Sequence, residues 1–366
     1  MFRRLFQGDW ILFSTVCLLL SIGLIILYSI SSSFENQNVF IRQAVFTSIG
    51  MGIIFSFPLF EYRHLARFST PVYFLMIVLL LGVLAWGSTI RGISGWIQIG
   101  GFQFQPVEIS KIVLVIFLSS FIAEKRSELG DFVRLVASLV LSSLLIVLVL
   151  KQPDLGSALV LAGIWFGMVV VSGIKKRHLL FLGVLFSLVV SVGWFLLVPY
   201  QKERIFTFLS PERDPRGSGY NVIQALVAVG SGGVTGKGIG NGSQSQLHFL
   251  PERHTDFIYA VIAEELGMIG GLLVLALFGV MLWRMTRIAL LARDNFGYLF
   301  GMGMTFMIFI QVVVNVGMNI GVLPVTGIPL PFLSYGGSSL LSACLGIAIL
   351  QNIASKKRDP ESFEWS

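Results

Sequence analysis

Charged residues are scarce in this chain of 366 residues: Asp, Glu, Lys and Arg together make up only 12% of it, whereas 55% of the residues are hydrophobic. The mean hydropathy is +0.84. A water-soluble fold has no interior large enough to bury that much apolar surface. The composition therefore excludes the soluble classes and indicates an integral membrane protein.

Cysteine is also nearly absent, and the two that occur, Cys17 and Cys344, both lie inside long apolar segments. Their positions exclude a disulfide framework and a zinc site built on cysteine. The sequence contains no dedicated cluster of metal ligands, so we predict no metal site made by the protein alone. A small-residue cleavage site is missing after the apolar segment that begins at Trp10. We therefore expect this segment to remain as a helix and not to be removed as a signal peptide.

Ten segments are apolar and long enough to cross about 30 Å of hydrocarbon as helices. They lie near residues 10–30, 39–59, 69–87, 106–123, 133–150, 155–173, 178–199, 255–283, 298–322 and 333–354. We predict an all-α integral membrane protein with ten transmembrane helices, forming a single polytopic domain over residues 1–366.

The net charge of +7 arises from basic residues that fall in short clusters between the apolar segments. This pattern is typical of charges that orient a membrane protein, and we expect no nucleic-acid partner. Most of the 26 basic residues lie on the side of the two termini. The positive-inside rule then predicts that both termini are cytoplasmic and that one large extracytoplasmic loop, about residues 200–254, joins helices 7 and 8.

Within this loop, YNVIQALVAV has the apolar spacing of a short interfacial or re-entrant helix. The neighbouring GSGGVTGKGIGNG resembles a phosphate-binding loop. It fails the Walker A pattern, because Ser231 stands where the first glycine is needed and Gly238 stands where Ser or Thr is needed. We interpret the stretch as a flexible glycine turn in which Lys237 is a candidate ligand for an anion.

Polar residues from separate parts of the chain fall at the outer ends of the predicted helices. Because they share one side of the membrane, we expect them to converge on one outward-facing cavity. Charges near the bilayer midplane, which ion-coupled transporters need, are scarce by comparison. The outer polar residues are Arg91, Trp96, Glu108, Lys111, Lys151, Asp154, Arg204, Arg213, Asp256 and Ser334.

Several of these residues also have a purely structural interpretation. Glu108 and Lys111 follow Pro106 and share a helix face, so they form an ion pair with each other or line the cavity. Asp154 stands at a helix start, where it caps exposed N–H groups or faces the cavity. Trp96 is an interfacial aromatic residue or a substrate contact.

Three carboxylates accompany the eighth predicted helix. Asp256 lies at its entrance, where Thr255 or Asp256 is the expected N-cap unless the aspartate serves catalysis. Glu264 lies about 12 Å deeper, and Glu265 points nearly opposite to Asp256. At most one glutamate can lie near the Asp256 face, and we expect the other to support helix packing through a hydrogen bond or to stay protonated.

Five long motifs resemble, in order, those of the SEDS family (shape, elongation, division and sporulation). They are FQPVEISK, KQPDLGSA, SPERDPRGSGYNVIQ, LPERHTDFIYAVIAEELG and NVGMNIGVLPVTGIPLPFLSYGGSS. The stretch GIPLPFLSYGG is similar to the RodA branch more than to the FtsW branch. The resemblance implies a ten-helix peptidoglycan glycosyltransferase that polymerises lipid II at the outer face of the bacterial cytoplasmic membrane, with a class B penicillin-binding protein as partner.

The resemblance also assigns residues. It places the essential aspartate of the family at Asp256 and the Glu and Lys of its QPxExxK motif at Glu108 and Lys111. The chain departs from the family at Val107, Gly95 and Ala225, where Ser or Ala, Arg, and Ser are common. Roles of those side chains do not carry over, and Arg91 is a candidate replacement for the missing cation.

The chemistry implied by the resemblance agrees with the predicted topology. No nucleoside triphosphate is available outside the cytoplasmic membrane, so an outward-facing site needs a donor that is already activated, such as a sugar on a polyprenyl pyrophosphate. Asp256 is the candidate general base on the acceptor hydroxyl. The other candidate substrate-binding residues are Trp96, Glu108, Lys111, Asp154, Arg204, Arg213, Lys237 and Ser334, with Glu108 and Asp154 orienting Lys111 and the cations stabilising the pyrophosphate.

No cofactor is certain from the sequence, and Mg²⁺ or another divalent cation is a candidate because it needs few protein ligands. Two alternatives to the enzyme remain open. One is a transporter that flips the lipid-linked sugar across the bilayer. The other is a non-catalytic scaffold for a penicillin-binding protein.

Overall fold

The computed structural model describes most of the chain. The described residues are 8–32, 37–56, 60–90, 92–99, 102–124, 132–173, 175, 177–178, 180–184, 195, 202, 206–213 and 218–356. Most of the seventh predicted helix, residues 178–199, lies outside them.

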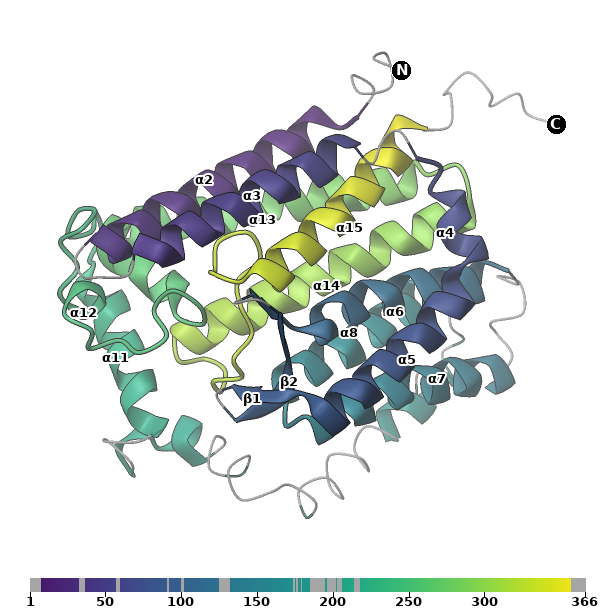
Figure 1. Ribbon diagram of the computed structural model, residues 1–366, viewed down its shortest axis with the longest axis horizontal. Coiled ribbons are helices and arrows are strands. Elements are labelled where there is room, and N and C mark those ends of the chain that lie inside the picture. The colour runs from purple at the N-terminus through teal and green to yellow at the C-terminus, as the bar shows by residue number, and fades with distance from the viewer. Residues whose placement is uncertain are drawn as a thin grey trace.

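Long apolar helices make up most of the described chain (Figure 1). They are α2 (Trp10–Ser32), α3 (Gln37–Ser56), α5 (Ser69–Trp86), α6 (Pro106–Ala123), α7 (Phe132–Lys151), α8 (Leu155–Val171), α13 (Ile258–Leu290), α14 (Asn295–Asn319) and α15 (Gly337–Ser355). Eight of them are long and apolar enough to span a membrane, and α8 is a shorter apolar helix. Together they account for every predicted spanning segment except the seventh.

The long helices lie side by side, and both chain ends lie at the same end of the bundle (Figure 1). We call this the terminal end. Short elements lie at or near the two ends of the bundle: α4 (Arg63–Arg67), the 3-10 turn Pro211–Arg213, α11 (Ser218–Ser231) and α12 (Ser243–Gln246). Of these, α11 and α12 lie at the end opposite the chain ends, which we call the far end (Figure 1).

The outer helices carry large apolar side chains on their exposed faces, as Leu75, Val78 and Trp86 of α5 show. A soluble monomer rarely exposes so much contiguous apolar surface. Helices α6, α14 and α15, by contrast, are largely buried, with most of α6 enclosed. The distribution fits a bundle whose rim faces lipid.

A small antiparallel sheet at the far end was not predicted. Strands β1 (Ser88–Ile90), β2 (Ile93–Ile99) and β3 (Phe102–Phe104) pair in the order β1-β2-β3 between α5 and α6. The all-α prediction is therefore wrong for this connection. Its alternating β-branched residues, such as Ile93 and Ile97, favour extended backbone, and the segment is too short to span as a helix.

Helix α13 was predicted as one continuous span, but Gly267 breaks it with φ 69° and ψ −167°. The glycine turn of residues 232–238 fills the break. The N–H groups of Lys237 and Gly238 donate to the carbonyl oxygens of Glu264 and Glu265, each at 3.0 Å. On the other side, the N–H of Met268 donates to Gly233 O at 2.9 Å, and Ile269 N donates to Val234 O at 3.2 Å. Backbone groups opened within an apolar bundle are thus satisfied by the loop.

The same contacts explain why this loop is rich in glycine. A Cβ on Gly236 would lie 2.2 Å from Glu265 O, and one on Gly267 would lie 2.3 Å from Gly236 N. Only glycine allows these backbones to approach so closely. The prediction of a glycine turn is confirmed, and the predicted short helix in YNVIQALVAV is confirmed as α11, which packs against α13 and α14.

Candidate functional site

Asp256 lies in the turn 251–257 that leads into α13, and its side chain is partly buried. The expected N-cap at Thr255 or Asp256 is wrong, because the N-cap is Phe257 and no side chain caps the helix there. The backbone supplies an acceptor instead. Glu252, at φ 52°, turns its carbonyl toward the N–H groups of Thr255, Asp256 and Phe257, at 3.1, 3.1 and 3.3 Å.

The loop around Gly327 joins Asp256 to the start of α8. A Cβ on Gly327 would lie 3.6 Å from Oδ2 of Asp256, so this loop passes directly beside the carboxylate. On its other side, a Cβ on Gly156 would lie 2.7 Å from Thr326 O. The tertiary structure therefore brings Asp256 and the helix start that holds Asp154 to either side of one short loop.

Asp154 is the N-cap of α8, as predicted, and its Oδ1 accepts the N–H of Ser157 at 2.8 Å. Its Oδ2 accepts the side-chain amide of Gln105 at 3.3 Å. Burial raises the pKa of Asp154, while the bonds from Ser157 and the charge of Lys111 oppose the shift. The carboxyl group is thus held in a polar cluster with little solvent.

Glu108 and Lys111 form the predicted ion pair in the first turns of α6, with Nζ and Oε1 2.6 Å apart. The side chains are only 4% and 1% exposed. Two charges sealed in this way must remain paired, because removing one would leave the other buried and uncompensated. The charges of both side chains also act on Asp154, and the role of Glu108 and Asp154 in orienting Lys111 stays a prediction.

An opening lies next to the turn that carries Asp256. It is a cavity of about 190 Å³ between the far ends of α2 and α3 and residues 248–254. Its lining is mixed, with apolar Ile30 and Val39 on one side and His248, Glu252 and Arg253 on the other. Polar groups of both charges beside an apolar wall suit a ligand that has a sugar and a lipid part.

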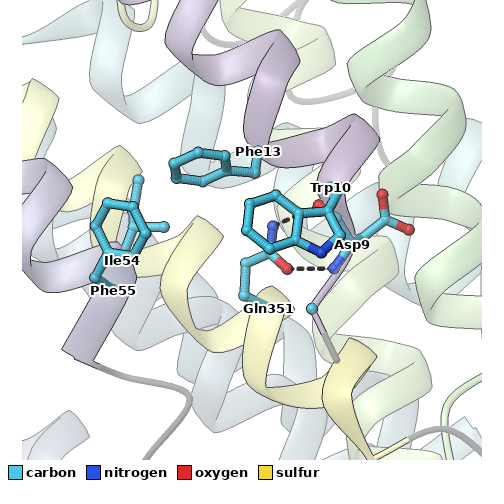
Figure 2. Close-up of a pocket in the computed structure, with 7 residues that line it drawn as sticks. Asp9, Trp10, Phe13, Ile54, Phe55 and Gln351 are labelled. Carbon is cyan, nitrogen blue, oxygen red and sulfur yellow. Dashed lines mark hydrogen bonds between the residues drawn. The ribbon is translucent and has the colours of Figure 1, made fainter. Parts of the chain in front are cut away.

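A smaller pocket lies at the terminal end of the bundle (Figure 2). Figure 2 shows the backbone of Asp9 and the side chain of Gln351 joined by two hydrogen bonds, of 2.7 and 2.9 Å. Arg284 also pairs with the Asp9 carboxylate. None of the predicted site residues lines this pocket, and its polar groups fasten α2 to α13 and α15.

The profile of the FtsW, RodA and SpoVE family of cell cycle proteins matches residues 9–359. The chain belongs to this family. Stage V sporulation protein E of Bacillus subtilis is 41% identical over 96% of this chain and 98% of its own length. The peptidoglycan glycosyltransferase MrdB of Escherichia coli K12 is 37% identical over 89% of each chain. A solved chain from a peptidoglycan synthase complex superposes with a TM-score of 0.84 at 32% identity, covering 95% of this chain and 98% of that one.

The resemblance drawn from the motifs is thereby confirmed. In this member of the FtsW, RodA and SpoVE family, the structure places two of the predicted substrate contacts, Ser334 and Trp96. Ser334 is buried, and its hydroxyl donates to Thr255 O at 2.6 Å and accepts Leu330 N at 2.8 Å. These contacts hold backbone, and the role of Ser334 in binding substrate stays a prediction. The indole N–H of Trp96 in β2, in contrast, is buried with no acceptor among the described residues, so its prediction as a substrate contact stands.

Lys237 was predicted to bind an anion. In the structure its ammonium group is paired with a carboxylate of the protein, Glu264. Its Nζ lies 2.9 Å from Oε1 of Glu264 and 2.9 Å from Ser243 Oγ. Glu264 also accepts the N–H groups of Gln244 and Ser245, at 2.9 and 3.0 Å. These contacts fasten the glycine loop and α12 to α13, and the role of Lys237 in binding substrate stays a prediction.

Glu265 also joins α13 to neighbouring segments. It accepts Ser29 Oγ of α2 at 2.8 Å and Gln246 Nε2 at 3.0 Å. The prediction that a glutamate would support packing through a hydrogen bond is therefore confirmed, and it holds for both glutamates.

Three predicted cations cannot be placed. Arg91 and Arg204 lie outside the described residues, and so does the side chain of Arg213, whose backbone ends the turn Pro211–Arg213. Their roles stay predictions. Within the described part of the chain, no three His, Cys, Asp or Glu side chains gather in a way that could hold a metal ion.

The sequence analysis missed two asparagines and a threonine beside Asp256. Asn315 and Asn319 are fully buried in α14, and both donate to the carbonyl oxygen of Asp256. Thr326 is buried beside Gly327, and its hydroxyl has no partner within the described chain. A signal was present, since two amides four residues apart in an apolar span indicate a function or a structural bond.

Proposed function

We propose that this chain is a peptidoglycan glycosyltransferase that polymerises lipid II into glycan strands during cell elongation. The names of its relatives support the reaction class, since MrdB is described as a peptidoglycan glycosyltransferase and several FtsW proteins as probable ones. The observation that carries the proposal is the position of Asp256. It is a partly buried carboxylate that follows, two residues on, a segment lining a cavity, and one loop separates it from the Asp154, Glu108 and Lys111 cluster.

The proposed topology has ten transmembrane helices with both termini in the cytoplasm of a bacterial cell. Basic residues at the terminal end, such as Arg63, Arg284 and Lys356, support this orientation through the positive-inside rule. The far end then faces outward, and Asp256 meets the disaccharide of a lipid-linked substrate while the polyprenyl tail stays in the bilayer.

In the proposed step, the acceptor sugar hydroxyl attacks the anomeric carbon of the donor. Asp256 takes the hydroxyl proton as the new C–O bond forms, a contribution of about 10²–10⁴-fold. The bond from the anomeric carbon to the polyprenyl pyrophosphate breaks, and the pyrophosphate leaves with the electron pair. Direct attack inverts the configuration at that carbon.

The developing negative charge of the pyrophosphate calls for positive charge nearby. Lys111, although paired with Glu108, is proposed to contribute positive charge near the leaving pyrophosphate. Arg204 and Arg213 are proposed to contact the phosphates. Mg²⁺ or another divalent cation is a candidate cofactor, because it needs few protein ligands. One carboxylate of the protein and the pyrophosphate oxygens would hold it, and it would neutralise charge on the leaving group. A class B penicillin-binding protein is the proposed partner, supported by the similarity to a chain of a complex that coordinates polymerization and crosslinking.

The test is polymer formation from purified lipid II by the wild type, Asp256→Asn and a control, Asp294→Asn. Asp294 is also an aspartate that meets a helix start, but it caps α14 and pairs with Arg63 at the terminal end. We expect Asp256→Asn to abolish polymer without lowering the melting temperature. Asp294→Asn should lower the melting temperature and leave the rate per folded molecule unchanged.

Polymerisation by Asp256→Asn at the wild-type rate would remove this residue from the mechanism. The two rival functions give other outcomes. A flippase would move labelled lipid II across a liposome membrane and form no polymer. A scaffold would still stimulate a penicillin-binding protein after both Asp256 and Lys111 are neutralised.

A further inference from the structure

Three successive carbonyl groups just before Phe257, the N-cap of α13, are held by residues from other parts of the fold. His254 O accepts the N–H of Tyr335 at 2.7 Å, and Thr255 O accepts Ser334 Oγ at 2.6 Å. Asp256 O accepts the side-chain amides of both Asn315 and Asn319, each at 3.0 Å. The backbone that carries the proposed base is thus held at every residue.

The two asparagines do more than donate to Asp256. Asn319 uses its Oδ1 to accept the N–H of Ala260, the third residue of α13, at 3.0 Å. Asn315 donates to Ile328 O at 2.8 Å, which ties down the loop that runs beside the Asp256 carboxylate. Both side chains are fully buried, and Asn319 Nδ2 also donates to Asn315 O at 2.8 Å.

We propose that Asn315 and Asn319 are positioning residues for Asp256, an inference that rests on the proposed function. Because α13 has no side-chain cap of its own, Asn319 caps it from a neighbouring helix and at the same time bonds the carbonyl of the aspartate. Asn315 fixes the same carbonyl relative to the 326–328 loop. Together they set the direction in which the Cα–Cβ bond of Asp256 leaves the backbone.

The chemistry requires such control, because a general base acts only within hydrogen-bond reach of the proton it removes. A displacement of about 1 Å caused by a residue away from the reacting atoms can lower a rate by about 10²-fold. An amide suits this position, since Asn319 must donate and accept at once. An aspartate would place an unpaired carboxylate against the carbonyl oxygens of Asp256 and Asn315.

The test compares Asn315→Ala and Asn319→Ala with the matched control Asn352→Ala in the purified full-length protein. Asn352 is equally buried and also joins a helix to a distant backbone segment, donating to Phe60 O and accepting Tyr62 N, but it lies at the terminal end. Lipid II polymerisation gives kcat and KM, and thermal unfolding gives the loss of stability for each variant.

We expect kcat to fall about 10- to 100-fold in Asn315→Ala and Asn319→Ala, with KM for lipid II within about twofold of the wild type. Asn352→Ala should lose a similar amount of melting temperature and keep its kcat. If an alanine variant does not fold, Asn315→Ser or Asn319→Ser replaces it, because the shorter hydroxyl introduces no buried charge and cannot replace both hydrogen bonds of the amide. Its kcat should fall as in the alanine variant.

Unchanged kcat in folded variants of both asparagines would overturn the proposal, and so would an equal loss of kcat in Asn352→Ala. Failure of the proposed function itself would give a different set of results. In that case Asp256→Asn retains polymerisation, or the wild type forms no polymer, whatever the asparagine variants do.

Discussion

Lys111 Nζ lies 2.6 Å from Glu108 Oε1 in an ion pair that is almost completely buried. The pair is close enough in sequence to form within one helix, yet its burial depends on α8, α14 and the other helices packed around α6. Breaking a buried pair typically destabilises a protein by about 3–5 kcal/mol, whereas replacing both partners with apolar residues is often close to neutral.

For this reason Glu108→Leu and Lys111→Met should each lower the melting temperature strongly, and the double variant should recover most of the loss. Polymerisation separates structure from chemistry. If Lys111 stabilises the pyrophosphate, the double variant is stable but has a much lower kcat. Recovery of kcat together with stability would show that the pair is structural alone.

Lys237 offers a second test of that distinction, because its cation is bound by Glu264. We expect Lys237→Met to lower the melting temperature, since Glu264 loses its charged partner in a buried position. KM for lipid II should stay unchanged. Ser243→Ala, which removes another contact of the same cluster without altering charge, is the control. A raised KM in Lys237→Met alone would restore Lys237 as a pyrophosphate ligand.

Gly267 should resist substitution because the chain bends there. Its φ of 69° favours glycine, and an added Cβ would lie 2.3 Å from Gly236 N. We expect Gly267→Ala to destabilise the protein by more than about 1 kcal/mol. Gly279→Ala, in the same helix with nothing within 4 Å of the added Cβ, should instead leave the protein unchanged or slightly more stable. Equal melting temperatures for the two variants would argue against the break.

His248 predicts a pH dependence. Slight desolvation lowers the pKa of this largely exposed side chain, and the charge of the neighbouring Arg253 lowers it further. The folded state therefore prefers neutral imidazole. This contribution to stability is present above the unfolded pKa, about 6.5, and is lost as the pH falls through that value toward the lower folded pKa.

His248→Gln should remove this part of the pH dependence. We expect the melting temperature of the wild type to fall relative to that of His248→Gln between about pH 7 and pH 5. Thermal unfolding across this range in a single detergent measures the difference. A constant difference at every pH would contradict the lowered pKa.

Contacts between residues close in sequence could be predicted from the chain alone. Asp154 caps the helix that begins one residue later, and Glu108 meets Lys111 three residues on, so helix geometry was enough. The length and apolarity of the segments likewise determined the membrane class, because the hydrocarbon thickness sets a minimum helix length.

The environment of Asp256 was decided by tertiary packing. Asn315, Asn319 and Ser334 lie 59 to 79 residues from the carbonyl groups of Asp256 and Thr255 that they hold, and no local rule links such positions. The break at Gly267 was not predicted for the same reason. A single glycine within an apolar run is expected to continue the helix, and the hydrogen bonds that satisfy the break come from a second segment. The sequence by itself determined which groups are polar and how deep they lie. Only the packing of helices decided which of them meet, since an unsatisfied polar group in an apolar interior must find a partner wherever the fold brings one.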